Sequence, residues 1–216
     1  MNQTASRPAP PGPIEGRFAF TGPRRSGKTT MARLVAAKLN FPLYDTDEIF
    51  LQQYKITIQA FVKTTGWLNF RRVENGIVMD LFSSLPKNAV VSLGGGVLAH
   101  DIDRYLRELN TQRVTEKSQV IYLIPSPSLE ESARILTVRE LRSLEDPSRP
   151  PLPQTDTRAQ SLYDQTLRLI TQRHPFYLSA SKGFVVYEND ETEREQEAVI
   201  KRADLVMAEM AALLRK

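Results

Sequence analysis

The sequence predicts a single α/β domain in which helices cover both faces of a parallel sheet. Short apolar runs rich in Val, Ile and Phe alternate along the chain with longer segments whose apolar residues recur at helical spacing. The short runs lack strict apolar–polar alternation, which indicates strands buried on both faces. The chain has 216 residues, of which 41% are hydrophobic, a size that suits one domain with a full core. This alternation is typical of a three-layer α/β fold.

The apolar runs are predicted to be the strands of the sheet. They are Arg17–Thr21, Phe41–Tyr44, Ala89–Leu93, Gln119–Ile124 and Gly183–Tyr187. The helical segments between them are Lys28–Leu39, Asp47–Leu85, Asp101–Arg113, Leu129–Leu144 and Thr157–Ala180. A closing helix is expected over Glu191–Lys216, whose apolar stripe consists of Val199, Ala203, Val206, Met210 and Leu213.

Two proline-rich segments are expected to lie outside these elements. Residues 1–16 contain four prolines and two glycines with almost no large apolar side chains, which predicts a disordered tail. Glu145–Asp156 contains four prolines in twelve residues, which predicts an exposed loop. The predicted domain therefore spans residues 17–216.

The composition excludes several classes of protein. Without cysteine the chain has no disulfides, no zinc–thiolate site and no cysteine nucleophile. Its apolar runs are far shorter than the roughly 20 residues needed to cross a bilayer, and residues 1–16 lack a targeting signature, so we expect a cytoplasmic protein without a membrane partner. The net charge of +4 is mild and contains no long basic block, which suits an anionic small molecule rather than nucleic acid. A monomer is expected.

The segment Gly22–Thr29 (GPRRSGKT) predicts a nucleotide site. It fits the pattern G-x-x-x-x-G-K-[ST], follows the first predicted strand and opens the first helix. Glycines let backbone N–H groups approach phosphate oxygens, and the helix N-terminus adds a favourable dipole. Lys28 would neutralise the β- and γ-phosphates, and Thr29 would place its hydroxyl on Mg²⁺. The expected nucleotide contacts are Gly22, Arg25, Ser26, Gly27, Lys28, Thr29 and Thr30.

Polar and glycine residues after the second and third strands predict an acceptor site. Asp45 and Asp47 follow the second strand, at the sheet edge where α/β folds bind ligands. One carboxylate can serve Mg²⁺ through water while the other faces an acceptor hydroxyl, although an aspartate here is also a normal helix N-cap. Gly94, Gly95 and Gly96 follow the third strand and let the backbone approach a ligand, although such a cluster also occurs in plain turns.

Three arginines are candidate anion ligands. Arg71 and Glu74 are three residues apart in a helical segment and can form an ion pair that orients the guanidinium, although such pairs also lie on many solvated helix faces. Arg173 is either an anion anchor or a charge near a helix C-terminus. Arg149 stands in the proline-rich loop, where the arginine of a closing lid would be expected.

Taken in order, these motifs resemble those of the shikimate kinase family over nearly all of residues 17–210. The family has a P-loop, D-T-D, F-R-x-x-E, G-G-G, an R-P-L-L lid and a late R-x-P-x-Y. The matching segments here are Gly22–Thr29, Asp45–Asp47, Phe70–Glu74, Gly94–Gly96, Arg149–Leu152 and Arg173–Tyr177. The chain departs from the family at Arg25, where glycine is common, at Pro151, where the lid usually has leucine, and at Trp67, where an acidic residue is usual before F-R.

The resemblance implies a P-loop kinase fold with a five-stranded parallel sheet of order 2-3-1-4-5, helices on both faces and a mobile lid at about residues 145–156. It also implies transfer of the γ-phosphate of ATP to the 3-hydroxyl of shikimate, with Mg²⁺ as cofactor. Asp47 would hold the ring hydroxyls and act as base or orienter, and Asp45 would assist Mg²⁺. Arg71 and Arg173 would grip the shikimate carboxylate.

The remaining roles implied by the resemblance concern four residues. Glu74 would aim Arg71, and the backbone of Gly95 would contact a ring hydroxyl. Arg149 would close over the phosphates, and Arg194 would lie on the adenine or phosphate side of the nucleotide.

Two alternatives stay open on the sequence. One is a related small-molecule kinase with another polyol or carboxylate acceptor, such as a gluconate-type kinase. The other is a kinase-like module that binds nucleotide with little turnover, which Arg25 and the altered lid would permit. Asp47 and the pair Arg71 and Arg173 argue against a neutral acceptor.

Overall fold

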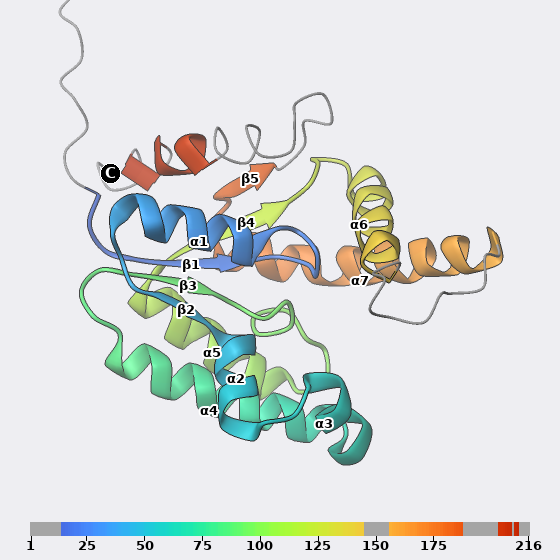
Figure 1. The fold of residues 1–216 in the computed structure, drawn as a ribbon, viewed down its shortest axis with the longest axis horizontal. Helices are drawn as coiled ribbons and strands as arrows, with labels where there is room; N and C mark the ends of the chain where they lie inside the picture. Colours follow the sequence, from blue (N-terminus) through green and yellow to red (C-terminus); the bar gives the residue numbers. More distant parts are fainter. Residues whose placement is uncertain (1–13, 145–155, 188–202, 209, 212–216) are drawn as a thin grey trace, which may run out of the picture.

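The computed structural model describes residues 14–144, 156–187, 203–208 and 210–211 and has a parallel sheet with helices on both faces (Figure 1). The sheet order is β2-β3-β1-β4-β5, and all four pairings are parallel. The strands are β1 (Arg17–Thr21), β2 (Leu43–Asp45), β3 (Ala89–Ser92), β4 (Gln119–Ile124) and β5 (Val185–Tyr187). The predicted fold and strand order are confirmed.

Seven labelled helices join these strands in the described part of the chain. They are α1 (Lys28–Leu39), α2 (Thr46–Tyr54), α3 (Ile58–Thr65), α4 (Trp67–Ser84), α5 (Arg104–Lys117), α6 (Leu129–Leu144) and α7 (Asp156–Ala180). None of the described helices is long and apolar enough to cross a bilayer.

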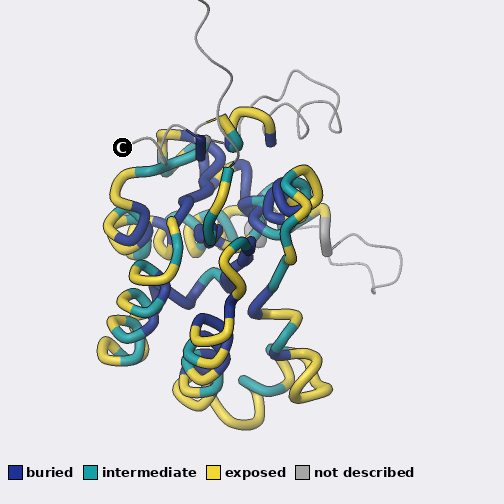
Figure 2. The backbone as a smooth tube through the Cα atoms, turned by 90° about the vertical axis from the view of Figure 1, so that its left-hand side faces the viewer, coloured by how far each residue is buried: buried dark blue, intermediate teal, exposed yellow. Residues whose placement is uncertain are grey.

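The two faces of the sheet form separate parts of the core, and the central strands β3, β1 and β4 between them are mostly buried (Figure 2). On one face Phe18 and Phe20 pack with α1 and with the helical residues of the C-terminal segment. On the other face Ala19 and Val91 pack with α4 and α5. Successive residues of β1 therefore point to opposite layers, as expected of a strand covered on both sides.

The C-terminal segment contributes to this core as the apolar stripe predicted. Residues 203–208 and 210–211 are helical, and Ala203, Val206 and Met210 are fully buried. The rest of the predicted closing helix lies outside the described residues. The same is true of residues 1–13 and 145–155, so the disordered tail and the lid stay predictions.

Residues 14–16, which we assigned to the tail, contact the domain. The backbone N–H of Gly16 donates to Asn88 Oδ1 at 2.8 Å, and Ile14 packs against the face of the sheet that α1 covers. Glu15 forms an exposed ion pair with Lys87. The packed part of the domain therefore begins before Arg17.

The helical segment predicted over Asp47–Leu85 is divided into α2, α3 and α4. Helix α2 ends at Tyr54 and is followed by Lys55, which adopts a left-handed conformation with φ 57°. Thr57 caps α3 by accepting a hydrogen bond from the N–H of Ala60 at 3.1 Å. Gly66, with φ 83° and ψ 163°, separates α3 from α4. Apolar spacing alone did not reveal these breaks, because all three helices present apolar residues to one aromatic cluster around Phe50 and Phe70.

Gly66 occupies a backbone region that is essentially restricted to glycine, so we expect Gly66→Ala to destabilise the domain. The free energy of unfolding should fall by about 1–3 kcal/mol, measured by urea denaturation. Gly76→Ala is the matched control, because Gly76 lies within α4 and a Cβ there has no neighbour within 4 Å. That change should stabilise by about 0.5–1 kcal/mol, and equal effects of the two substitutions would contradict the assignment.

Candidate active site

The phosphate loop leaves β1 at Gly22 and enters α1 at Lys28. Gly27 is the N-cap of α1 with φ 87°, and Gly22 has φ 144°. A Cβ at Gly22 would overlap the carbonyl oxygen of Leu123, so this position requires glycine. Lys28 Nζ donates to the carbonyl of Pro23 at 2.8 Å, so the ammonium group lies across the loop that it helps to form.

Arg25 is the residue at which the loop departs from the usual glycine, and its backbone is left-handed with φ 66°. An arginine there carries a conformational cost that glycine would not. Two residues of α6 contact it: Arg25 Nε donates to Glu140 Oε2 at 2.7 Å, and Arg139 Nη1 donates to the Arg25 carbonyl at 3.1 Å. Glu140 also pairs with Arg24 at 3.3 Å, so α6 holds the tip of the loop.

Three oxygen-bearing side chains meet beside the start of α1. Thr29 Oγ1 donates to Asp45 Oδ2 at 2.9 Å and lies 3.1 Å from Ser92 Oγ. The other carboxylate oxygen of Asp45 accepts from the backbone N–H of Asp47 at 2.9 Å. Asp45 is therefore the N-cap of α2 and a neighbour of the nucleotide loop at the same time.

These oxygens fit Mg²⁺, which prefers hard oxygen ligands and usually combines one or two carboxylates with substrate phosphates and water. The described residues contain no group of three or more His, Cys, Asp or Glu side chains that could hold a metal. Ser92 was not among the predicted site residues. Its place at the end of the third strand, close to the glycine triplet, is the feature of the sequence that could have indicated it.

Asp47 lies in the first turn of α2, opposite the glycine triplet. A Cβ on Gly94 would approach Asp47 Oδ1 to 2.6 Å, so a side chain at this position would displace the carboxylate. The side chain of Asp47 reaches solvent, but desolvation by the surrounding protein and the charge of Asp45 raise its pKa, while Lys28, Arg71 and Arg24 oppose the rise. A carboxyl group with a raised pKa at the junction of both predicted subsites suits a proton acceptor.

Arg71 and Glu74 form a buried ion pair, so the interpretation of this pair as part of a solvated helix face is wrong. Arg71 Nη1 and Glu74 Oε2 are 2.6 Å apart, and both side chains are 5% exposed. The pair is buried because α4 faces the glycine triplet, and a Cβ on Gly96 would overlap the Arg71 guanidinium. Burial raises the pKa of Glu74 to about 7, an effect that the neighbouring Arg71 limits.

The Arg71 guanidinium is also flanked by two aromatic rings. Its Cζ lies 5.2 Å from the centroid of Trp67 and 5.1 Å from that of Phe70, distances that allow cation–π attraction. Arg71 Nε is buried and makes no hydrogen bond. An unsatisfied buried donor is costly, which indicates that a ligand or water completes this group.

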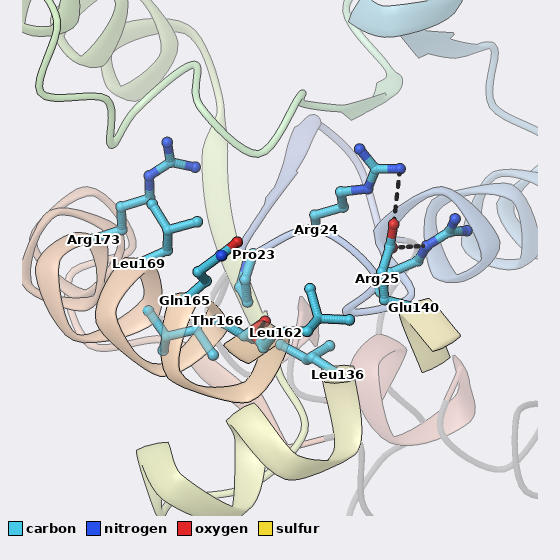
Figure 3. A pocket seen from close by; sticks show the side chains of 11 residues that line it. Pro23, Arg24, Arg25, Leu136, Glu140, Leu162, Gln165, Thr166, Leu169 and Arg173 are labelled. Carbon is cyan, nitrogen blue, oxygen red and sulfur yellow. Dashed lines mark hydrogen bonds and ion pairs between the residues drawn. The ribbon is translucent and has the colours of Figure 1, made fainter. Parts of the chain in front are cut away.

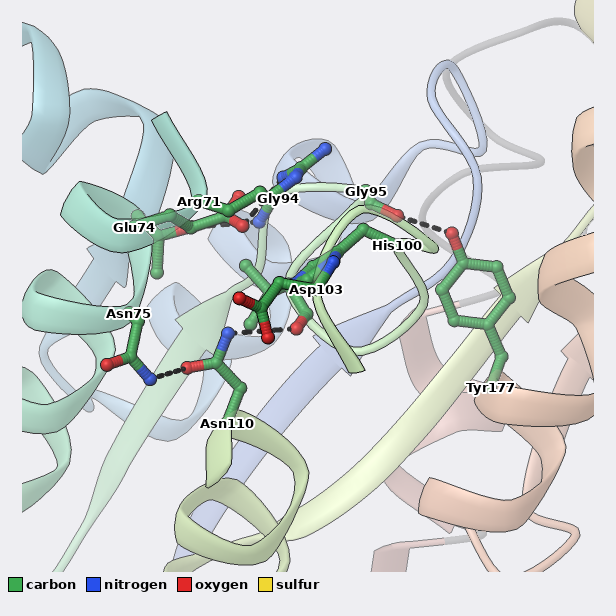
Figure 4. Close-up of polar contacts among 11 residues, drawn as sticks. Arg71, Glu74, Asn75, Gly94, Gly95, His100, Asp103, Asn110 and Tyr177 are labelled. Carbon is green, nitrogen blue, oxygen red and sulfur yellow. Dashed lines mark hydrogen bonds and ion pairs between the residues drawn. The ribbon is translucent and has the colours of Figure 1, made fainter. Parts of the chain in front are cut away.

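Arg173 lies inside α7, which continues to Ala180, so the interpretation as a charge at the helix end is wrong. One turn further along, the hydroxyl of Tyr177 donates to the carbonyl of Gly95 at 2.5 Å (Figure 4). Burial raises the pKa of Tyr177 to about 12, so it remains a donor. The helix that carries Arg173 is thus joined to the glycine triplet.

A cavity of about 180 Å³ lies between the phosphate loop and helices α6 and α7 (Figure 3). Arg24 from the loop and Arg173 from α7 are on its two sides, and their guanidinium groups point to the same end of it. Its other lining residues are Pro23, Arg25, Leu136, Glu140, Leu162, Gln165, Thr166, Leu169 and Ile170. The cavity therefore connects the nucleotide loop with a predicted acceptor residue.

The structure brings most of the predicted site residues together at the carboxyl end of the sheet. Lys28, Thr29 and Asp45 lie on the nucleotide side, and the charges of Lys28 and Arg71 both act on Asp47 between them. Thr30 lies next to Thr29 in the first turn of α1 and is exposed. Arg149 and Arg194 lie outside the described residues.

His100 is a neighbour of the site that no sequence pattern indicated. It is fully buried, and its Nδ1 accepts from the N–H of Asp103 at 3.4 Å. Burial, followed by the charges of Arg71 and Arg107, lowers the pKa of His100 to about 4, so the imidazole is neutral.

Comparisons with known proteins agree on one family. A sequence model of that family, described as shikimate kinase, matches residues 24–204. The shikimate kinase of Caldicellulosiruptor saccharolyticus is 32% identical over 74% of this chain and 80% of its own. Shikimate kinase 2 of Photorhabdus laumondii is 28% identical over 77% of this chain and 83% of its own.

Solved structures show the same fold. The shikimate kinase of Acinetobacter baumannii in complex with shikimate superposes with a TM-score of 0.70 at 22% identity, covering 94% of this chain and 97% of that one. The shikimate kinase of Bacteroides thetaiotaomicron gives a TM-score of 0.66 at 22% identity, covering 90% of this chain and 99% of that one. The matching family model, the relatives and the phosphate loop together establish that this chain belongs to the shikimate kinase family of ATP-dependent kinases.

Proposed function

We propose that this chain transfers the γ-phosphoryl group of ATP to the 3-hydroxyl of shikimate, with Mg²⁺ as cofactor. The observation that carries the proposal is the buried Arg71–Glu74 pair beside Asp47, which directs a guanidinium toward the acceptor side of the phosphate loop. Such a guanidinium suits an acceptor with a carboxylate, and relatives that are about 30% identical are shikimate kinases.

On the nucleotide side, backbone N–H groups of Gly22–Gly27 and the N-terminus of α1 would bind the phosphates. Ser26 Oγ is buried without a partner within the loop and would serve as a further donor. Lys28 would leave the Pro23 carbonyl for the β- and γ-phosphates, and Thr29 with Asp45 would hold Mg²⁺, which supplies charge neutralisation on the transferring group.

On the acceptor side, two arginines on different helices would fix the orientation of the ring. Arg71 on α4 and Arg173 on α7 would bind the carboxylate from two directions, with Glu74 aiming Arg71. Asp47 would accept the proton of the attacking hydroxyl, and the backbone of Gly94, Gly95 and Gly96 would contact the ring. Orientation is most of what phosphoryl transfer requires of a protein.

The proposal is tested by coupling ADP release to a spectrophotometric signal, with ATP and Mg²⁺ present and shikimate, gluconate or no acceptor added. We expect turnover that depends on shikimate. Turnover with gluconate but not with shikimate would identify the chain as a gluconate-type kinase instead. Nucleotide binding without turnover on any acceptor would support a binding module instead.

Lys28→Met should reduce kcat by at least about 100-fold, because the ammonium group stabilises charge that develops on the phosphates. Circular dichroism should show the fold retained. Lys38→Met is the matched control, since Lys38 lies on the same helix and pairs with Asp204 away from the loop. A Lys28→Met enzyme with near-normal turnover would remove Lys28 from the catalytic set.

Arg173→Ala should raise the KM for shikimate by about 30-fold or more, because it removes one of two charged ligands of the carboxylate, and should leave the KM for ATP nearly unchanged. Arg168→Ala, an exposed arginine on the same helix, should change neither constant. Equal increases in both KM values for Arg173→Ala would place Arg173 outside the acceptor site.

The pH profile of kcat/KM for shikimate should fall on the acidic side as Asp47 becomes protonated. Because the pKa of Asp47 is raised, this limb should lie above the range of an ordinary aspartate. Asp45→Asn keeps a good N-cap residue but removes the charge that contributes to the rise, so at saturating Mg²⁺ the limb should move to lower pH. An unmoved midpoint would show that Asp47 is not the titrating group.

A further inference from the structure

Arg107 contacts both the segment after the glycine triplet and helix α7, which carry different parts of the candidate acceptor site. It lies on α5, partly buried, and its Nη1 donates to the carbonyl oxygen of His100 at 2.8 Å. Its Cζ lies 4.1 Å from the centroid of the Phe176 ring, within the range of cation–π contact. One side chain thus joins the segment after the glycine triplet to helix α7.

Helix α7 contains Pro175 two residues after Arg173, which weakens the helix at this point without ending it. Proline has no N–H to donate to the carbonyl of Thr171, and its ring crowds that carbonyl, so the helix loses a bond next to Arg173. The helical turn around Pro175 contacts several other elements of the fold. His174 Nδ1 lies 2.9 Å from Tyr122 Oη, Arg107 covers Phe176, and Tyr177 donates to the Gly95 carbonyl.

The hydrogen bond from Arg107 to the His100 carbonyl lies close to the Arg71 guanidinium. The backbone N–H groups of Ala99 and His100 both donate to the carbonyl of Gly96 at 3.1 Å, so the His100 carbonyl lies in the same tight turn as Gly96. Gly96 is the residue whose missing Cβ leaves room for the Arg71 guanidinium. His100 itself is fully buried, which limits how far this turn can shift.

We propose that Arg107 is a positioning residue for acceptor binding, which holds Arg71 and Arg173 at the separation needed to grip one carboxylate. The inference rests on the proposed function. It assigns Arg107 no contact with substrate: its hydrogen bond fixes the turn beside Arg71, and its stacking on Phe176 fixes the helical turn beside Arg173. Two ligands of one carboxylate act together only if their spacing is maintained.

The test compares Arg107→Leu, Phe176→Leu and the double variant in the shikimate-dependent assay. Each single change should raise the KM for shikimate by roughly twofold to fivefold, as expected for loss of a cation–π contact to Phe176, a residue that is 36% exposed, with the KM for ATP unchanged. Because either change breaks the same contact, the double variant should be no worse than Arg107→Leu alone. Arg107→Lys keeps a cation above the ring but not the guanidinium geometry, so it should be intermediate.

Arg104→Leu is the matched control, because Arg104 lies on the same helix in an exposed pair with Glu108. It should leave both KM values as in the wild type. Melting temperatures are recorded for every variant, and if Arg107→Leu does not fold, Arg107→Lys and Phe176→Leu carry the comparison.

Three results would overturn the inference: unchanged KM values, parallel increases for shikimate and ATP, or fully additive effects in the double variant. Failure of the proposed function looks different, since wild-type enzyme would then show no shikimate-dependent turnover. Wild-type turnover with an unaltered shikimate KM in Arg107→Leu refutes the positioning role alone.

Discussion

The buried ion pair between Arg71 and Glu74 is the constraint on which the rest of the acceptor side depends. Taking two charges out of water costs more than their attraction commonly returns, so the pair is a poor device for stability. Around it the chain provides two aromatic faces, from Trp67 and Phe70, and a backbone without a Cβ at Gly96. These features suit a guanidinium that is oriented before its ligand arrives.

Each of the three consecutive glycines lies against a different neighbouring group. Gly94 gives room to the carboxylate of Asp47, and Gly96 gives room to the guanidinium of Arg71. Gly95 lies against the backbone of the phosphate loop, and its carbonyl accepts from Tyr177. One short segment therefore touches Asp47, Arg71, the nucleotide loop and the helix of Arg173, and a side chain at Gly94 or Gly96 would displace a charged group.

The sequence predicted the parts of this molecule that depend on local pattern. Runs of Val, Ile and Phe located the strands, and the phosphate loop carried its own spacing. It did not reveal that Arg71 is buried, because an i,i+3 pair looks the same on a solvated face, nor that Lys55 and Gly66 break one amphipathic segment into three helices. Ser92 contacts Thr29 and Arg107 contacts Phe176, residues distant in sequence, so these contacts leave no periodic signal.

The distribution of charge explains why a net charge of +4 says so little about the site. Arg25 is paired with Glu140, Arg71 with Glu74, and the Lys28 ammonium lies against a backbone carbonyl. These partners fix the cations in place and offset their repulsion, at a cost in desolvation. An anionic substrate that binds such a cluster meets donors already oriented, so its binding energy is not used to order long side chains. Local pairing, rather than the overall surplus of positive charge, is therefore what prepares this site for two anions at once.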